Sequence, residues 1–285
     1  MIKTPLSTVI GGAFWTPGAT VINGAKLSFE IVMKKLFANG EQGFWYDPND
    51  LSAMFQDAAG TVPVTAAGQP VGLIRDKSGR NNHAYQTTSA SRPILRKNAV
   101  TGANYLEFDG TDDFLQTNNI DFTGTDKVSL FAGVRKLSDA SPAVVVELST
   151  AWGSNPRAFA LLAPSYVGGS GYTAAARLDI ADVANQQAII LTGHPSPNTS
   201  TLSALITPTE TKLRANGVLK ATNTGAKGTG NYGNHPLYIG RRGGTSLSFN
   251  GHIYGLIGIG KLASDAETIA IEKELAKRLG VTLNV

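Results

Sequence analysis

The chain has 285 residues, 42% hydrophobic and 16% charged, with 25 basic and 21 acidic side chains that leave a net charge of +4. This composition is typical of a soluble globular protein with a substantial core, and the small, scattered basic excess argues against a nucleic-acid partner. The absence of cysteine excludes disulfides and thiolate chemistry. Because no long apolar run and no recognisable leader occur, we expect neither membrane insertion nor a secretory signal.

Residues 1–43 differ in pattern from the rest and are predicted to form an arm that contains a helix over residues 25–38. Asn23 is the expected N-cap, because its side-chain oxygen can accept an unpaired backbone N–H, and Asn39-Gly40 supplies a left-handed stop. One apolar stripe follows helical spacing along it: Phe29, Val32, Met33, Leu36 and Phe37. The stripe must be buried against the chain's own core, a sister subunit or a larger assembly. We assign it a docking role, with burial against the chain's own core as the alternative.

From residue 44 onward, short apolar runs alternate with polar residues and turn signals, which predicts one antiparallel all-β sandwich over residues 44–285. Asn216-Gly217 between two strand-like runs predicts a type I′ hairpin over residues 211–220, because both central residues of that turn need positive φ. Neither an internal repeat nor a domain boundary interrupts the pattern. Further strands are predicted at residues 128–134, 143–148, 159–162, 172–180, 187–191, 202–206, 237–240 and 252–259.

A second helix is predicted at the C-terminal end of the chain. Ser264 and Glu267 have the spacing of a capping box, in which each side chain accepts the other residue's backbone N–H. Ile271, Leu275 and Leu279 give this helix a core-facing side, and Gly280 is predicted to end it.

Two stretches resemble the signature of the laminin-G-like, concanavalin-A-like jelly rolls. Residues 76–83 match a D-x-S-G-x-x-N-H turn, and residues 106–113 read L-x-F-D-G-x-D-D. The opening at residues 43–52 is similar to the start of laminin-G-like modules in tailed-bacteriophage virion proteins. The resemblance covers residues 44–285 and implies a concanavalin-A-like jelly-roll β-sandwich with an N-terminal helical arm and a C-terminal helix.

The same resemblance implies a role, although a shared fold alone does not fix a function. The chain would be a virion component, made in the host cytoplasm, on a tail fibre, a spike or the capsid surface. Residues 1–43 would dock it onto other virion proteins. A homo-oligomer is expected, and a trimer would suit a fibre.

Glycan hydrolysis is the enzymatic alternative, because glucanases share the concanavalin-A-like fold. Their E-x-D-x-x-E pattern places two carboxylates on one strand face. Glu107 and Asp109 begin that pattern, but Gly110-Thr111 turns the chain, and Asp112-Asp113 replaces the distal Glu. We therefore predict no enzymatic activity.

The acidic side chains of this turn are also candidates for a calcium site, since calcium prefers oxygen ligands. The candidate ligands are Asp109, Asp112 and Asp113, with Asp76 as a fourth contributor. The alternative is structural: Asp109 and Asp112 would accept backbone N–H groups and hold the turn. No other cofactor is expected.

Aromatic residues in polar, Gly-rich loops are the candidate ligand contacts, because sandwich loops carry recognition while the sheets stay rigid. These residues are Trp152, Tyr166, Tyr172 and Tyr232, each of which could instead belong to the core. The predicted function is non-enzymatic adhesion to a host-surface glycan. A purely structural decoration protein without a ligand is the alternative.

Overall fold

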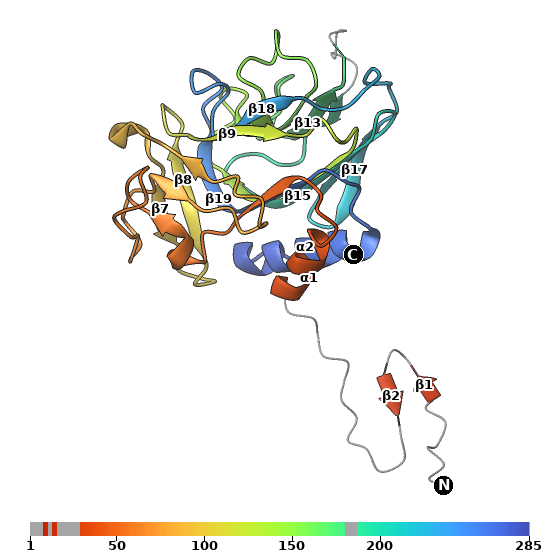
Figure 1. Cartoon of the computed structure of the whole chain (residues 1–285), viewed down its shortest axis with the longest axis horizontal. Helices are drawn as coiled ribbons and strands as arrows, with labels where there is room; N and C mark the ends of the chain where they lie inside the picture. Colours follow the sequence, from red (N-terminus) through yellow and green to blue (C-terminus); the bar gives the residue numbers. More distant parts are fainter. Residues whose placement is uncertain (1–7, 11–12, 16–28, 180–186, 285) are drawn as a thin grey trace.

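Two antiparallel sheets stack face to face in the computed structural model, which describes residues 8–10, 13–15, 29–179 and 187–284 (Figure 1). The first sheet has the order β17 (Val218–Asn223), β16 (Thr211–Ala215), β15 (Asn198–Ile206), β10 (Val128–Lys136), β19 (Asn250–Ile259), β8 (Asn104–Asp109) and β7 (Ile94–Lys97), and β3 (Gly43–Tyr46) also pairs with β19. The second sheet has the order β14 (Gln187–Ile190), β13 (Tyr172–Arg177), β12 (Ala158–Leu162), β11 (Val144–Leu148), β18 (Asn234–Ile239), β9 (Leu115–Asp121), β6 (Ala84–Tyr85), β5 (Leu73–Ile74) and β4 (Met54–Phe55). The predicted all-β sandwich is confirmed.

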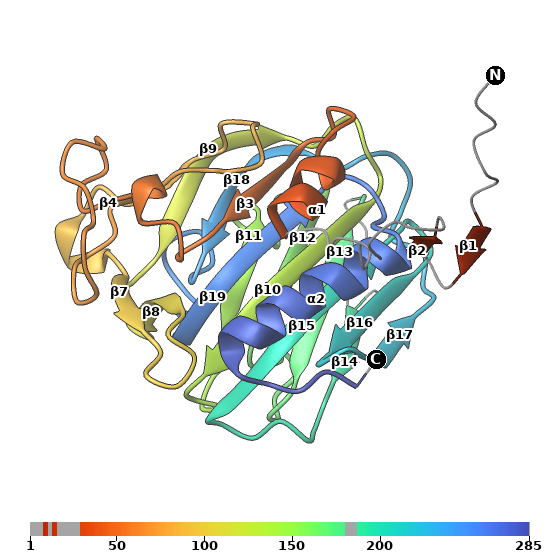
Figure 2. The same cartoon turned by 90° about the horizontal axis from the view of Figure 1, so that it is seen from below.

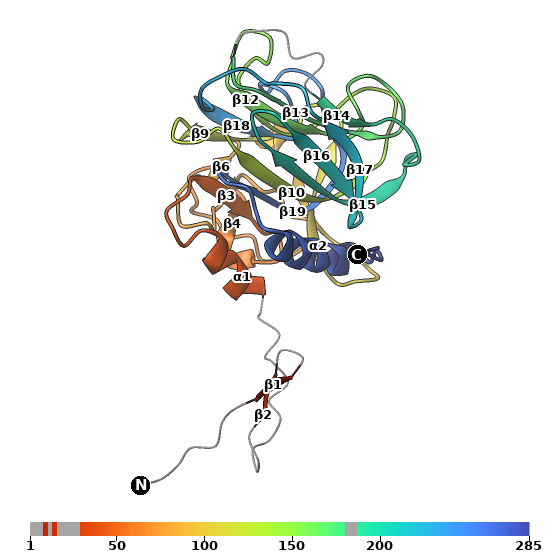
Figure 3. The same ribbon diagram turned by 90° about the vertical axis from the view of Figure 1, so that its right-hand side faces the viewer.

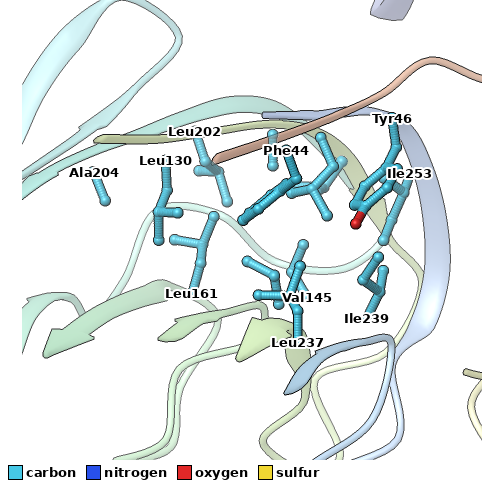
Figure 4. Close-up of a cluster of buried hydrophobic side chains, with 14 of the residues drawn as sticks. Phe44, Tyr46, Leu130, Val145, Leu161, Leu202, Ala204, Leu237, Ile239 and Ile253 are labelled. Carbon is cyan, nitrogen blue, oxygen red and sulfur yellow. The ribbon is translucent and has the colours of Figure 1, made fainter. Parts of the chain in front are cut away.

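The core lies between the two sheets, where every second side chain of a strand points inward. In Figure 4, Leu130 and Leu202 of the first sheet face Val145, Leu161 and Leu237 of the second, and all five are fully buried. Burial of one such aliphatic side chain is worth roughly 1.5–3 kcal/mol. The period-two burial that the sequence predicts therefore stabilises the stack of sheets.

The outer face of the first sheet is covered by α1 (Phe29–Leu36) and α2 (Asp265–Leu279), which lie side by side on it in Figure 2. Met33 and Leu36 of α1 have no exposed surface, and Phe37 just beyond it is also buried. They pack in one cluster with residues of β3, β10, β19, α2 and the segment that precedes α2: Trp45, Phe131, Ile257, Ile259, Ala263, Ile271 and Leu275.

The docking role predicted for the apolar stripe is therefore corrected. Met33, Leu36 and Phe37 already cover the chain's own sandwich, and Phe29 packs edge-on against Trp45 with ring centroids 5.8 Å apart. Val32 is only partly buried. The expected cap Asn23 and residues 25–28 of the predicted helix lie outside the described residues.

The C-terminal helix and the hairpin have the predicted local chemistry. Ser264 and Glu267 form the capping box, and Gly280, at φ 71°, ends α2 in the left-handed region. Asn216 and Gly217 have φ values of 49° and 81° between β16 and β17, as a type I′ turn requires.

The D-x-S-G-x-x-N-H turn fastens the start of the sandwich. One carboxylate oxygen of Asp76 accepts the backbone N–H groups of Trp45 and Ser78, both at 2.8 Å. Its other oxygen accepts the Ser78 hydroxyl and the N–H of Asn82. Asp76 therefore satisfies buried donors of the turn and of β3, and it is absent from the acidic group formed by Asp109, Asp112 and Asp113.

Three pieces of short structure complete the described chain. β1 (Thr8–Ile10) pairs with β2 (Ala13–Trp15), and 3-10 turns span Leu51–Ala53 and Ser89–Ser91. Among the described residues, neither α1 nor α2 combines the length and the apolar character that a bilayer-crossing helix requires.

Leu36→Ala is expected to lower the free energy of unfolding by about 2–5 kcal/mol, because it leaves a cavity between α1 and the first sheet. The matched control is Ile31→Ala on the exposed side of the same helix, where Ile31 is 41% exposed and the cost should stay within about 0.5 kcal/mol. Urea denaturation measures both values. Equal effects of the two variants would contradict the packing of α1 on the sandwich.

Candidate functional site

Loops cover part of the outer face of the second sheet over β11 and β12. Val144, Ala160 and Leu162 point away from the core yet are buried, because Trp152 and Leu247 pack against them. Trp152 lies in the loop of residues 149–157, and Leu247 lies in the loop of residues 240–249. The first loop connects β11 to β12 and folds back over them, whereas the second connects β18 to β19 and reaches across to the same two strands.

Glu147 lies beneath these loops on the outer face of β11. It pairs across the sheet with Ala160 of β12 and Tyr238 of β18, and its side chain has no exposed surface. Its Oε2 accepts a hydrogen bond of 2.8 Å from Arg242 Nε, whereas Oε1 has no partner among the described residues. Burial raises the pKa of Glu147 to about 7, although the nearby Arg242 charge acts in the opposite direction.

The guanidinium of Arg242 lies close to two aromatic rings. Its central carbon is 5.7 Å from the ring centroid of Trp152 and 5.8 Å from that of Tyr166, both within cation–π range. Arg242, Trp152, Tyr166 and Glu147 come from three loops and one strand. We call these four residues the Trp152–Arg242 site.

The loop that carries Arg242 approaches the Trp152 loop closely. A Cβ at Gly243 would lie 2.2 Å from the carbonyl oxygen of Thr150, and Gly243 has a φ of 54°, so glycine is required here for two reasons. Arg242 itself donates its backbone N–H to the Ser246 carbonyl at 2.8 Å. The loop geometry therefore fixes the backbone position from which the Arg242 side chain extends.

The Trp152 loop is held by hydrogen bonds at both ends of its turn. Arg177 Nη1, at the end of β13, donates to the Trp152 carbonyl at 2.5 Å. Asn155 Oδ1 accepts from the Thr150 hydroxyl at 2.6 Å and from the Ala151 N–H at 2.9 Å. The indole is therefore presented by a constrained backbone.

The structure brings together two of the four predicted aromatic ligand contacts. Trp152 is half-buried and Tyr166 is 51% exposed, and both face Arg242. For Tyr172 and Tyr232 the prediction is corrected, because neither has exposed surface. Tyr172 donates its hydroxyl to Asn198 Oδ1 at 2.6 Å, and Tyr232 packs edge-on against Phe159, so both serve the core.

Sequence reasoning missed Glu147 and Arg242. Glu147 is the single charged residue in a run of otherwise buried apolar residues, Val144-Val145-Val146-Glu147-Leu148, and a buried charge must be paired. That signal was present in the sequence. Arg242 gave no comparable signal, because it lies in a polar loop where a surface charge needs no explanation.

The acidic turn holds itself together by hydrogen bonds. Asp109 Oδ1 accepts the N–H of Thr111 at 2.7 Å and of Asp112 at 3.3 Å, and Asp113 Oδ2 accepts the N–H of Asp109 at 3.0 Å. Asp112 Oδ2 instead accepts the Ser91 hydroxyl at 2.6 Å. The turn-holding role predicted for Asp109 is confirmed, whereas the Asp112 carboxylate binds a side chain.

The same three carboxylates could contribute part of the six to eight oxygen ligands that calcium takes. One oxygen from each of Asp109, Asp112 and Asp113 lies within 4.8 Å of the others. Burial, followed by the charge of Asp109, raises the pKa of Asp113 to about 7. A bound cation would relieve the repulsion between the Asp109 and Asp113 carboxylates. Calcium binding at this turn stays a prediction.

Glu107 and Asp109 are engaged in an ion pair and in a turn, respectively. Glu107 forms an ion pair of 3.0 Å with Arg96, and Gly110, at φ 79°, turns the chain directly after Asp109. The Asp109 carboxylate points to the turn that it holds. The pair that begins a glucanase-like pattern thus has other partners.

Comparisons with known proteins find similarity in fold alone. No family model and no curated protein matches the chain. Domain 4 of AbnA, a GH43 extracellular arabinanase from Geobacillus stearothermophilus, in complex with arabinotriose, is 11% identical with a TM-score of 0.53, over 81% of this chain and 97% of that one. A GH54 α-L-arabinofuranosidase is 12% identical with a TM-score of 0.59, over 87% and 64%. The ligand-binding domain of botulinum neurotoxin serotype D, in complex with N-acetylneuraminic acid, is 11% identical with a TM-score of 0.53, over 85% and 52%. The chain therefore spans about half to two thirds of the last two.

Calcium is expected to stabilise the protein more at pH 8 than at pH 6. The carboxyl of Asp113 must lose its proton to bind the ion, and its pKa is raised to about 7. At a free calcium concentration 100 times Kd, linkage gives about 2.7 kcal/mol of added stability. Thermal unfolding with calcium or chelator measures the shift, and Asp113→Asn should reduce it. An unchanged Tm at pH 8 would leave the three carboxylates with their hydrogen-bonding roles alone.

Without calcium, the raised pKa of Asp113 acts in the opposite direction. The folded state holds the Asp113 proton more tightly than the unfolded state does. The stability that this proton contributes is therefore fully present below about pH 4 and is lost as the pH rises through about 7. Asp113→Asn should therefore flatten the pH dependence of Tm between pH 5 and pH 8 in chelator, which gives the calcium experiment its baseline.

Proposed function

We propose that the chain is a carbohydrate-binding protein whose ligand contacts the Trp152–Arg242 site. The observation that carries this proposal is the pair of accessible aromatic side chains, Trp152 and Tyr166, whose ring centroids lie 5.7 and 5.8 Å from one fixed guanidinium. Aromatic rings offer apolar faces to the C–H groups of a sugar, and a guanidinium donates hydrogen bonds to its oxygens. Such a site needs a rigid scaffold beneath variable loops, which the sandwich supplies.

The structural neighbours support this proposal. Sandwiches of similar fold include a domain solved with arabinotriose and a toxin domain solved with N-acetylneuraminic acid. Fold does not fix function, so these neighbours raise the expectation of a sugar ligand without identifying it.

We propose binding without hydrolysis. Most glycoside hydrolases use two carboxyl groups that flank the scissile bond, roughly 5–10 Å apart. Strands β11, β12, β13, β14 and β18 contribute one carboxylate in total, that of Glu147. Glu147 is enclosed and paired with Arg242, so it lacks both a carboxyl partner on these strands and access to a substrate.

The setting that we propose is a tailed-bacteriophage virion, in which the sandwich extends from a tail fibre, a spike or the capsid surface and adheres to a host-surface glycan. This part of the proposal is supported by the sequence resemblance at residues 43–52 and 76–83. Because the stripe of α1 is covered by the sandwich, the docking segment would be residues 1–28, and other virion proteins or sister subunits would be its partners. A structural decoration protein without a ligand is the second candidate.

Trp152→Ala is expected to weaken glycan binding by about tenfold or more, since truncation of a central aromatic contact typically costs at least about 2 kcal/mol. The matched control is Tyr85→Ala, a partly exposed tyrosine of β6 on the same sheet, which should leave affinity unchanged. A glycan array followed by calorimetry on the hits measures both variants. A reducing-sugar assay on the same glycans should detect no turnover.

If no glycan binds saturably, the carbohydrate-binding proposal fails, and the result favours the structural decoration role. Turnover that Glu107→Gln abolishes would instead establish the hydrolase alternative.

Deletion of residues 1–28 is expected to preserve the Tm and the glycan affinity of the sandwich while abolishing incorporation into particles. The reason is that α1, which begins at Phe29, already packs on the first sheet. Deletion of residues 1–43 is the informative comparison, because it also removes Met33 and Leu36 and should destabilise the fold. Normal particle incorporation of the shorter deletion would contradict the docking role of the arm.

A further inference from the structure

The guanidinium of Arg242 binds the rest of the protein through only one of its edges. Its Nε and Nη2 both lie 2.8 Å from a single oxygen, Glu147 Oε2. By contrast, Arg278 and Arg214 each engage both oxygens of a partner carboxylate, those of Asp47 and Glu272. Arg242 therefore leaves one edge of its planar guanidinium without an acceptor among the described residues.

That free edge reaches solvent. Nη1 of Arg242 has no hydrogen bond or ion pair with the described residues. Because it is not one of the buried side-chain atoms that lack a partner, it is accessible to solvent. The ring centroids of Trp152 and Tyr166 lie 5.7 and 5.8 Å from the guanidinium carbon. An accessible N–H edge close to two aromatic rings is suited to an acceptor carried on a ring-shaped ligand.

The charges around this edge favour an anionic acceptor. Arg177 also touches the site, through its bond to the Trp152 carbonyl. Glu147 is the one carboxylate that strands β11–β14 and β18 contribute, and it is buried behind Arg242. A ligand arriving from solvent therefore meets the cation first and the carboxylate only behind it.

We propose that the sugar bound at the Trp152–Arg242 site carries a carboxylate, which pairs with the free edge of Arg242 while Trp152 and Tyr166 contact the sugar ring. This inference rests on the proposed carbohydrate-binding function and deepens it. A planar carboxylate matches the fork of a guanidinium through parallel charge-assisted hydrogen bonds. A neutral sugar hydroxyl would use the same edge without the ionic contribution.

Glu147 makes the preference depend on pH. The charged group at its carboxyl is the Arg242 guanidinium from the loop of residues 240–249, and the titratable residue paired with it across the sheet is Tyr238 of β18. Tyr238 stays neutral near pH 7, because burial raises its pKa. Burial also raises the pKa of Glu147 to about 7, so its negative charge is lost as the pH falls from 8 to 6. Arg242 then has no counter-charge, and an anionic ligand should bind more tightly.

The experiment compares acidic oligosaccharides with their carboxyl-reduced counterparts, which keep the sugar backbone and replace –COO⁻ by –CH₂OH. The probes are oligogalacturonate, hyaluronan fragments and sialylated oligosaccharides on an array, with calorimetry on the best pair at pH 6 and pH 8. The acidic member should bind roughly tenfold or more tightly than its reduced partner. Its affinity should rise from pH 8 to pH 6, whereas that of the reduced partner should not change.

Variants of the ion pair should shift the two ligands differently. Arg242→Gln should remove the preference for the acidic member, and Glu147→Gln should strengthen acidic binding at pH 8 and abolish its pH dependence. The double variant Glu147→Gln with Arg242→Gln leaves no buried unpaired charge, and so it guards against misfolding of the single variants. Arg96→Gln is the matched control, because Arg96 pairs with Glu107 on the first sheet.

Two failures are distinguishable. If neutral glycans bind as well as acidic ones and Trp152→Ala abolishes both, the carbohydrate-binding function stands and the acidic preference is wrong. If acidic glycans bind but Arg242→Gln leaves their affinity unchanged, Arg242 is not the contact and the inference is also wrong. Absence of saturable binding to every probe, neutral or acidic, overturns the inference together with the function on which it rests.

Discussion

The burial of one face of each sheet against the other is the constraint on which the rest of the structure depends. Phe44, Leu130 and Leu202 from one side and Val145 and Leu161 from the other have no exposed surface. Stacking leaves two outer faces, and the chain treats them differently. The outer face of the first sheet is covered by α1 and α2 (Figure 3), whereas loops that carry Trp152, Tyr166 and Arg242 cover part of the other. The face without helices is therefore the one that carries the Trp152–Arg242 site.

Much of the fold could be predicted from local sequence. The capping box at Ser264, the turn at Asn216-Gly217 and the apolar stripe of α1 depend on neighbours within a few residues, so spacing alone reveals them. β9 (Leu115–Asp121) was harder, because its polar run Gln116-Thr117-Asn118-Asn119 lacks the expected alternation of apolar residues. The partner of the α1 stripe could not be predicted at all, since periodicity shows that a surface must be buried without showing against what.

The site was less predictable because tertiary structure assembles it. Trp152 and Tyr166 were found from their polar, Gly-rich surroundings, but the same criterion also selected Tyr172 and Tyr232, which the fold buries. Glu147 and Arg242 lie 95 positions apart, and nothing local links them. A carboxylate inside an apolar strand does indicate a missing partner. Only the stacking of loops over β11 identifies that partner as an arginine close to two aromatic rings.

The acidic turn and the Trp152–Arg242 site are mechanically connected. Ser248, in the loop that carries Arg242, donates its hydroxyl to the Thr111 carbonyl at 2.8 Å, and Asp109 and Asp113 hold that same turn. Repulsion among the three carboxylates works against the turn, and protonation of Asp113 or a bound cation relieves it. Whatever sets the charge of the turn therefore also sets how firmly one end of the Arg242 loop is anchored. Charge at the turn and charge at Glu147 would thus act on one loop, the first through its backbone and the second through its guanidinium.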